Sequence, residues 1–136
     1  MERKDITEYP FDKEFIVSNG YRLFPLNLEN DDHLLFHGAE LEKLDVILRE
    51  GLRPNPPLVT ISFGNESSTC LSHLMTTWGG TNSDRPELCI IAYRVDDLAR
   101  RQIIVFGPDR RINTEVHSYR PDACAYCIIP NTYKHI

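Results

Sequence analysis

Long hydrophobic runs are missing from this sequence. Its apolar stretches, such as residues 89–93 and 103–106, are far shorter than the about 20 residues that a helix needs to cross a bilayer. The first 15 residues interrupt every apolar segment with charged side chains, so a secretory signal peptide is not expected either. The sequence therefore predicts a cytoplasmic protein with no membrane partner.

An excess of positive charge is missing as well. The 136 residues carry 15 Lys and Arg against 20 Asp and Glu, a net charge of -5. Affinity for nucleic-acid phosphates comes mainly from Lys and Arg, so a nucleic-acid partner is not expected. The balance is uneven, because residues 1–50 carry twelve acids and six bases, whereas residues 94–120 carry six arginines and four acids. This arginine-rich stretch is either a solvated loop or a place where a small anionic ligand binds.

Cysteines are few, since the chain has four, at positions 70, 89, 124 and 127. Such a small and scattered set excludes a disulfide scaffold. Cys124 and Cys127 have a CxxC spacing, but residues 123–129 are typical of a buried strand, on which positions three apart point to opposite faces. No second CxxC exists to complete a tetrahedral site. We therefore expect no metal, and expect the thiols to act as small core hydrophobes.

What is present is an ordinary globular composition, with 41% hydrophobic and 26% charged residues. No internal repeat, low-complexity tract or long linker divides the chain, so residues 1–136 are expected to form a single domain. Within it, residues 1–19 are polar and mixed, with Pro10 opposing a helix, and are expected to be a partly docked N-terminal arm. Residues 21–28 are expected to be extended around Pro25.

The spacing of apolar residues predicts two short helices. Residues 39–50 place leucine and isoleucine on one face, and Gly51 is expected to cap this helix at its C-terminal end. Residues 66–78 are expected to form the second helix, with Asn65 as its N-terminal cap.

The remaining apolar runs predict strands. These runs are residues 33–37, 59–63, 88–95, 102–106, 114–118 and 123–129, which are short and separated by turn residues. Two helices among strands that are joined by short turns indicate an α+β domain with a mixed, mainly antiparallel sheet.

Polar residues at the ends of three of these strands form the candidate site. His37 and Gly38 end the first strand, where an imidazole that donates a hydrogen bond and an approachable backbone suit a carboxamide or a ribose hydroxyl. Ser62 lies near the end of the second strand, and Glu115 places one carboxylate near the start of a late strand. Structural explanations exist too, since a strand-end histidine is often satisfied within the fold and Glu115 can be an exposed edge residue.

In the order of these motifs the sequence resembles the ADP-ribosyltransferase superfamily. The resemblance covers residues 33–129 and rests on Leu-Phe-His-Gly, a helix, Gly-Leu-x-Pro, a strand with small polar residues, a second helix, a strand that ends in Val-Asp, and a late strand that begins with Glu115. It implies that His37 and Gly38 hold NAD, the co-substrate. It also implies that Ser62 stands at the middle motif and that Glu115 contacts the nicotinamide ribose.

Further ligand contacts follow from the same resemblance. An aromatic ring should cover the nicotinamide, and the candidates are Phe63, Trp78 and Tyr93. An arginine of residues 94–120 could hold the pyrophosphate. The sequence departs from the family at Ala39, where a hydroxyl residue is usual, and at Ser62, where the histidine-containing branch usually has tyrosine.

The function that the resemblance implies is that of a NAD-dependent mono-ADP-ribosyltransferase that modifies a protein target. Breaking the bond between nicotinamide and ribose leaves positive charge on the sugar, which a fixed carboxylate such as that of Glu115 stabilises. A single small domain of this kind fits a bacterial effector or a phage-type inhibitor, and a delivered effector would act in the host cytoplasm. The acid excess of residues 1–50 suits a basic target, which it would attract electrostatically.

Three alternatives stand beside this function. A nonenzymatic module of the same fold would bind a NAD-like ligand or a protein. An RNA 2'-phosphotransferase-like enzyme would need a basic groove, against which the acidic balance counts. In an interaction protein of another fold, the last strand over residues 123–129, with its two cysteines, would only contribute to the hydrophobic core. Release of nicotinamide from NAD separates the enzyme from the binding proteins.

Overall fold

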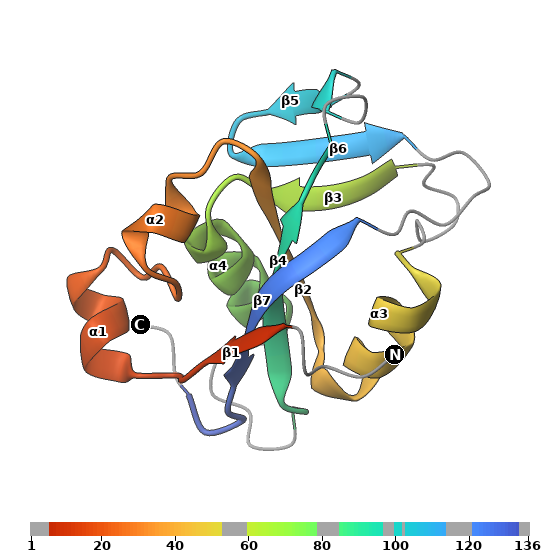
Figure 1. Ribbon diagram of the computed structural model, residues 1–136. Coiled ribbons are helices and arrows are strands. Elements are labelled where there is room, and N and C mark those ends of the chain that lie inside the picture. Colours follow the sequence, from red (N-terminus) through yellow and green to blue (C-terminus); the bar gives the residue numbers. More distant parts are fainter. Residues whose placement is uncertain are drawn as a thin grey trace.

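One twisted sheet runs through the molecule and carries the candidate site. The computed structural model describes residues 6–52, 60–78, 85–96, 100–101, 103–113 and 121–133. Seven strands lie in the order β1-β7-β4-β2-β3-β6-β5 (Figure 1). They are β1 Thr7–Tyr9, β2 Leu34–Glu40, β3 Thr60–Gly64, β4 Leu88–Arg94, β5 Ile104–Phe106, β6 Asp109–Asn113 and β7 Asp122–Ile129. Among the described strands, β1 and β7 alone pair in parallel, so the predicted α+β class with a mixed, mainly antiparallel sheet is confirmed.

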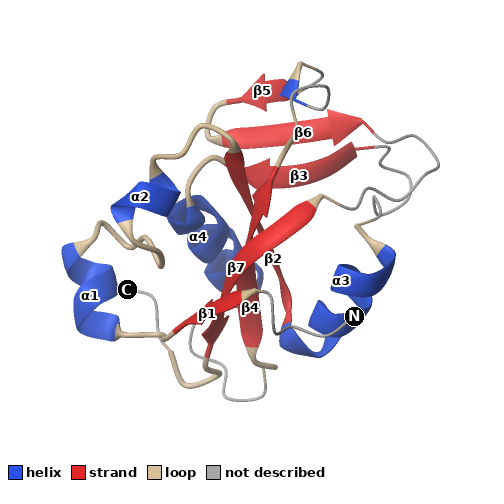
Figure 2. Ribbon diagram, viewed as in Figure 1, coloured by secondary structure: helices blue, strands red, loops and turns tan. Residues whose placement is uncertain are grey.

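Four α-helices and one 3-10 turn pack around the sheet within the described residues (Figure 2). They are α1 Lys13–Ser18, α2 Leu26–Glu29, the 3-10 turn η1 Leu41–Lys43, α3 Leu44–Glu50 and α4 Ser67–Trp78. The two expected helices correspond to α3 and α4. The first starts later than expected because β2 continues through Glu40. None of the described helices is long and apolar enough to span a bilayer.

The N-terminal part is more regular than the sequence suggests. The expected arm contains β1 and α1, and the segment expected to be extended around Pro25 turns into α2 directly after that proline. Asp12 explains α1, because its carboxylate accepts hydrogen bonds from Glu14 N at 3.1 Å and Phe15 N at 3.3 Å. Pro10 lies before this cap, where it interrupts no helical hydrogen bond. The expectation of an extended segment over residues 21–28 was therefore wrong after Pro25, while β1 attaches the N-terminal arm to β7.

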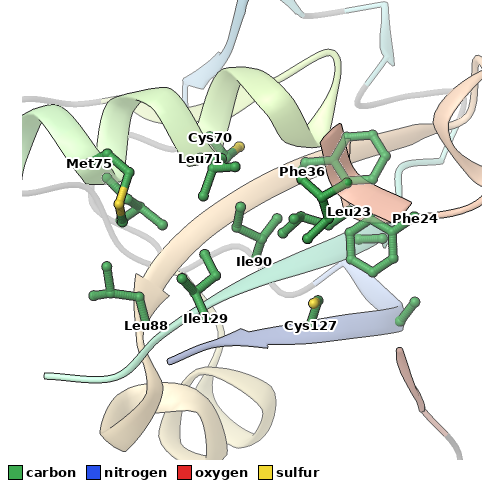
Figure 3. Close-up of a cluster of buried hydrophobic side chains, with 14 of the residues drawn as sticks. Leu23, Phe24, Phe36, Cys70, Leu71, Met75, Leu88, Ile90, Cys127 and Ile129 are labelled. Atoms are coloured by element: carbon green, nitrogen blue, oxygen red, sulfur yellow. The ribbon is translucent and has the colours of Figure 1, made fainter. Parts of the chain in front are cut away.

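Two hydrophobic clusters cover the two faces of the sheet, and alternate residues of the central strand β4 enter each. Ile90 and Ala92 belong to the α4-side core, with Ile16, Leu23, Phe24, Leu34, Phe36, Cys70, Leu71, Leu74, Met75, Leu88, Ala125, Cys127, Ile129 and Tyr133 (Figure 3). Ile91 and Tyr93 belong to the α3-side core, with Leu35, Leu44, Leu48, Leu52, Ile61, Phe63, Cys89, Val95, Ile112 and Tyr126. The sheet is therefore buried from both sides, which fixes the strands that carry the site.

A β-bulge on β7 changes the expected position of one cysteine. Ala92 pairs with Ala125 but Tyr93 pairs with Ala123, so Cys124 is the extra residue of the bulge. Cys124 packs against the α4-side core, to which Cys127 also belongs. The expectation that these two cysteines contact opposite faces was wrong, because the bulge interrupts the alternation.

Two other local expectations can be compared with the structure. Gly51 ends α3 with φ 90° and donates its N–H to Ile47 O, so the predicted cap is confirmed. In the arginine-rich stretch, residues 104–113 form the hairpin of β5 and β6 rather than a loop. The strand expected over residues 114–118 lies outside the described residues.

Candidate functional site

The sheet divides where β2 meets β3. These two strands share a single residue pair, Phe36 with Gly64, whereas β2 pairs with β4 over seven residues and β3 pairs with β6 over five. Beyond that pair the two strands separate, and β3, β6 and β5 run in a different direction from β2 and β4 (Figure 1). His37 and Gly38 follow directly after the shared pair, so they lie where the separation begins.

Hydrogen bonds at both ends of β2 show which of its residues face β4. Val95 N donates to His33 O at 2.9 Å, and Leu41 N donates to Glu87 O at 2.9 Å. In an antiparallel sheet, successive residues of an inner strand bond to one neighbour and then to the other. The register between β2 and β4 is unbroken, so the odd-numbered residues of β2 bond to β4 and the even-numbered residues face β3.

Gly38 is the even-numbered residue at the separation. Phe36, two positions earlier, uses its backbone groups in the pair with Gly64. Gly38 directs its N–H and C=O to the same side, but no residue of β3 pairs with it there. Among the described residues, one donor and one acceptor of the main chain thus lie next to each other on the side of β2 from which β3 separates, which we call the opening between the strands.

The His37 side chain bridges the same opening. Its Nδ1 lies 2.9 Å from Ser62 O, the carbonyl that would face Gly38 if the ladder continued. Because a carbonyl oxygen only accepts, Nδ1 carries the proton in the neutral ring and Nε2 is an acceptor. Burial lowers the pKa of His37, which favours this neutral form, although its hydrogen bond to Ser62 acts in the other direction. A ligand hydroxyl would therefore donate to Nε2, the reverse of the expected direction.

Gly38 is also fixed by packing. A Cβ added at this position would lie 2.9 Å from Leu74 Cδ1 and 3.0 Å from its Cγ. Leu74 belongs to α4, which therefore closes the α4-side face of the sheet behind the site. The absence of a side chain at Gly38 serves helix packing as well as access to its backbone.

Ser62 joins the site through its main chain. Its neighbours Ile61 and Phe63 point into the α3-side core, and its own exposed side chain leaves from the other face of β3. Directly across from it on β6 stands Arg111. Of the arginines in residues 94–120, Arg111 is thus the one that pairs with Ser62 in the sheet. Sequence reasoning missed it because β6 was not recognised as a strand.

The aromatic candidates are placed in the core. Phe63 and Tyr93 are each 2% exposed, and their rings meet edge to face at 6.1 Å between centroids. The Phe63 ring also lies 5.7 Å from the His37 ring and supports it from the α3-side core. Burial raises the pKa of Tyr93, whose hydroxyl has no hydrogen-bond partner among the described residues. Trp78 is partly buried against the α4-side core.

Glu115 lies outside the described residues. The last described residue of β6, Asn113, pairs with Thr60 of β3. The structure thus brings together His37, Gly38 and the Ser62 carbonyl, while contact of Phe63, Tyr93 and Glu115 with a ligand stays a prediction.

Neither a metal cluster nor a known relative adds to this geometry. Within the described ranges, no three His, Cys, Asp or Glu side chains gather closely enough to hold a metal ion. Comparisons of the chain with protein-family models, with curated proteins and with solved structures find no match. The geometry of the separated strands is therefore the main guide to function.

Proposed function

We propose that this chain is a NAD-dependent mono-ADP-ribosyltransferase of the ADP-ribosyltransferase superfamily, which transfers ADP-ribose from NAD to a protein side chain. One observation carries the proposal most directly. The sheet separates immediately after Phe36, so that the backbone of Gly38 and the ring of His37 face the same opening.

The backbone of Gly38 matches the carboxamide of nicotinamide. A carboxamide has an NH2 group that donates and a carbonyl that accepts, and it needs both partners on one side. The N–H and C=O of Gly38 point to the same side of β2, towards the opening. His37, one residue earlier, offers Nε2 to a ribose hydroxyl while Nδ1 keeps its bond to Ser62 O.

The proposed reaction replaces one bond at ribose C1' with another. The bond to the nicotinamide nitrogen breaks, its electron pair stays with nicotinamide, and the sugar becomes positively charged in the transition state. A target nucleophile then bonds to C1' and gives up its proton. Glu115 is proposed to stabilise the charged sugar and to orient that nucleophile.

A nonenzymatic module of the same fold is the second candidate, and the burial of Phe63 and Tyr93 favours it. Rings that are 2% exposed contact a nicotinamide only if their neighbours move. Such a module would still bind a carboxamide at Gly38. It would bind NAD without releasing nicotinamide, whereas the enzyme releases nicotinamide and labels a protein.

Glu115→Gln is the test of the enzymatic proposal. This change removes the charge but keeps the volume, so we expect nicotinamide release from NAD to fall by about 10²-fold or more while circular dichroism stays the same. Glu87→Gln removes one exposed charge elsewhere and should leave the rate unchanged. Full activity of a folded Glu115→Gln variant, or a wild-type protein that neither binds nor cleaves NAD, would overturn the assignment.

Salt is expected to separate target recognition from NAD chemistry. If the acid excess of residues 1–50 attracts a basic target, raising salt from low to physiological strength should slow target labelling much more than hydrolysis of NAD alone. A lysine-rich test protein and radiolabelled NAD allow both rates to be measured in one preparation. Equal salt dependence of the two rates would show that residues 1–50 do not attract the target electrostatically.

A further inference from the structure

Strand β5 is an open edge of the sheet with exposed apolar side chains. It is the last strand in the order, and in the described part of the chain it pairs on one side only, with β6. Ile104 is 44% exposed and Val105 is 62% exposed. Edge strands of soluble proteins usually carry charges or prolines that discourage pairing with other chains, and the three residues of β5 carry neither.

The hairpin geometry shows which backbone groups of β5 point outward. Phe106 and Asp109 close a two-residue turn, Gly107 and Pro108, in which Gly107 has φ 57°. In such a hairpin the closing pair is hydrogen-bonded, so the next pair, Val105 with Arg110, is not. The N–H and C=O of Val105 therefore point away from β6, beside its exposed side chain.

The charge around this edge selects the partner. Among the described residues from 96 to 113, two acids, Asp96 and Asp109, stand against four arginines. They are Arg100, Arg101, Arg110 and Arg111, and the last two lie directly opposite Val105 and Ile104 on β6. A second copy that paired edge to edge would bring two regions of net positive charge together, which disfavours its association. An acidic strand would meet opposite charges.

We propose that β5 accepts an extended acidic segment of a partner protein as an eighth strand of the sheet. The partner hydrogen-bonds to the N–H and C=O of Val105, places apolar side chains beside Val105 and Ile104, and brings its carboxylates into the net positive charge of this edge. This docking edge does not depend on the proposed function. It lies at the opposite end of the sheet from β1, and β1 belongs to the acid-rich residues 1–50.

Val105→Pro tests the backbone contact. The Val105 N–H is not used by β6, so proline removes the outward donor and leaves the hairpin paired, while Val105→Thr keeps the donor. The probe is a fluorescein-labelled octapeptide of alternating valine and glutamate, followed by fluorescence anisotropy with the full chain. We expect Val105→Thr to bind within about twofold of wild type and Val105→Pro to bind at least about tenfold more weakly. Melting curves of all three proteins check the fold.

The sequence of the probe tests the charge. An octapeptide of alternating valine and lysine should bind at least about tenfold more weakly than the glutamate peptide, and Arg101→Glu should narrow this difference. The proposal is overturned by equal binding of the two peptides, by no binding up to about 1 mM, or by wild-type affinity in a folded Val105→Pro variant. A dimer that Val105→Pro abolishes in sedimentation experiments would assign the edge to a second copy and would likewise overturn it.

Discussion

Glu29→Ala is expected to lower the free energy of unfolding by about 4 kcal/mol. Glu29 is 5% exposed, and its carboxylate accepts hydrogen bonds from Phe24 N at 3.2 Å, Ser67 N at 3.0 Å and Ser67 Oγ at 2.5 Å. Ser67 Oγ in turn accepts from Leu23 N at 2.8 Å. Alanine would leave three buried donors without an acceptor, each of which costs about 1–3 kcal/mol. The start of α4 would then lose its attachment to α2.

Urea unfolding followed by circular dichroism measures this loss. Glu50→Ala, at the exposed end of α3, removes a carboxylate of the same size and is expected to stay within about 0.5 kcal/mol of wild type. A comparable loss in the two variants would contradict the role assigned to the buried network of Glu29 and Ser67.

The pH dependence of stability gives a second readout of Glu29. Burial raises the pKa of its carboxyl above the ordinary value of 4.5, although hydrogen bonds from Ser67 and Phe24 oppose this. The folded protein therefore holds this proton more tightly than the unfolded chain. The resulting stabilisation is fully present below about pH 4.5 and is lost as the pH rises through the folded-state pKa. The stability of wild type relative to Glu29→Gln should fall with rising pH above this point. A rise would instead show that folding lowers the pKa of Glu29.

Arg85→Met is expected to lower the free energy of unfolding by about 3 kcal/mol. The Arg85 side chain is 2% exposed and donates to three carbonyls, those of Pro86 at 3.3 Å, Pro130 at 2.8 Å and Tyr133 at 2.8 Å. Burial lowers the pKa of its guanidinium. Methionine fills part of the volume but donates no hydrogen bond, so the turn after β7 loses its link to the segment before β4.

An exposed arginine provides the matched control for this change. Arg94→Met, on β4, removes a surface ion pair with Asp31 of 3.4 Å and is expected to cost less than about 1 kcal/mol. Thermal melts of both variants at one pH compare the two losses. If Arg85→Met melted like Arg94→Met, the buried guanidinium would have no anchoring role.

The sequence predicts the inner strands well because their residues are apolar on both faces. Residues 33–37, 88–95 and 123–129 correspond to β2, β4 and β7, all of which lie within the sheet. It fails where charge hides a strand, as in β6, whose arginines pair with β3. It also fails where a contact spans the chain. Asn65 was expected to cap α4, yet the first N–H of that helix donates to Glu29, 38 residues away.

The candidate site shows the same limit. His37 and Gly38 were expected to act because a strand ends there, but β2 continues to Glu40. What leaves the Gly38 backbone without a partner on β3 is the departure of that strand, and the His37 ring donates a hydrogen bond to the Ser62 carbonyl, 25 residues away in the sequence. Residue types at strand ends can suggest this site. Only the pairing of distant strands reveals that, within the described part of the chain, one backbone donor and one acceptor of Gly38 have no partner on β3.

The parallel pair of β1 and β7 imposes a delay on folding during synthesis. Thr7 pairs with Ala125, and the Tyr126 hydroxyl donates to Glu8 across 118 residues. At about 5–20 residues per second, a ribosome needs roughly 6 to 24 s to extend the chain from one strand to the other. During that interval β1 has no native partner, and the α4-side core lacks the side chains that β7 supplies. The acidic Glu8 in this first strand is therefore a safeguard for the nascent chain, because a charged side chain discourages pairing with other strands.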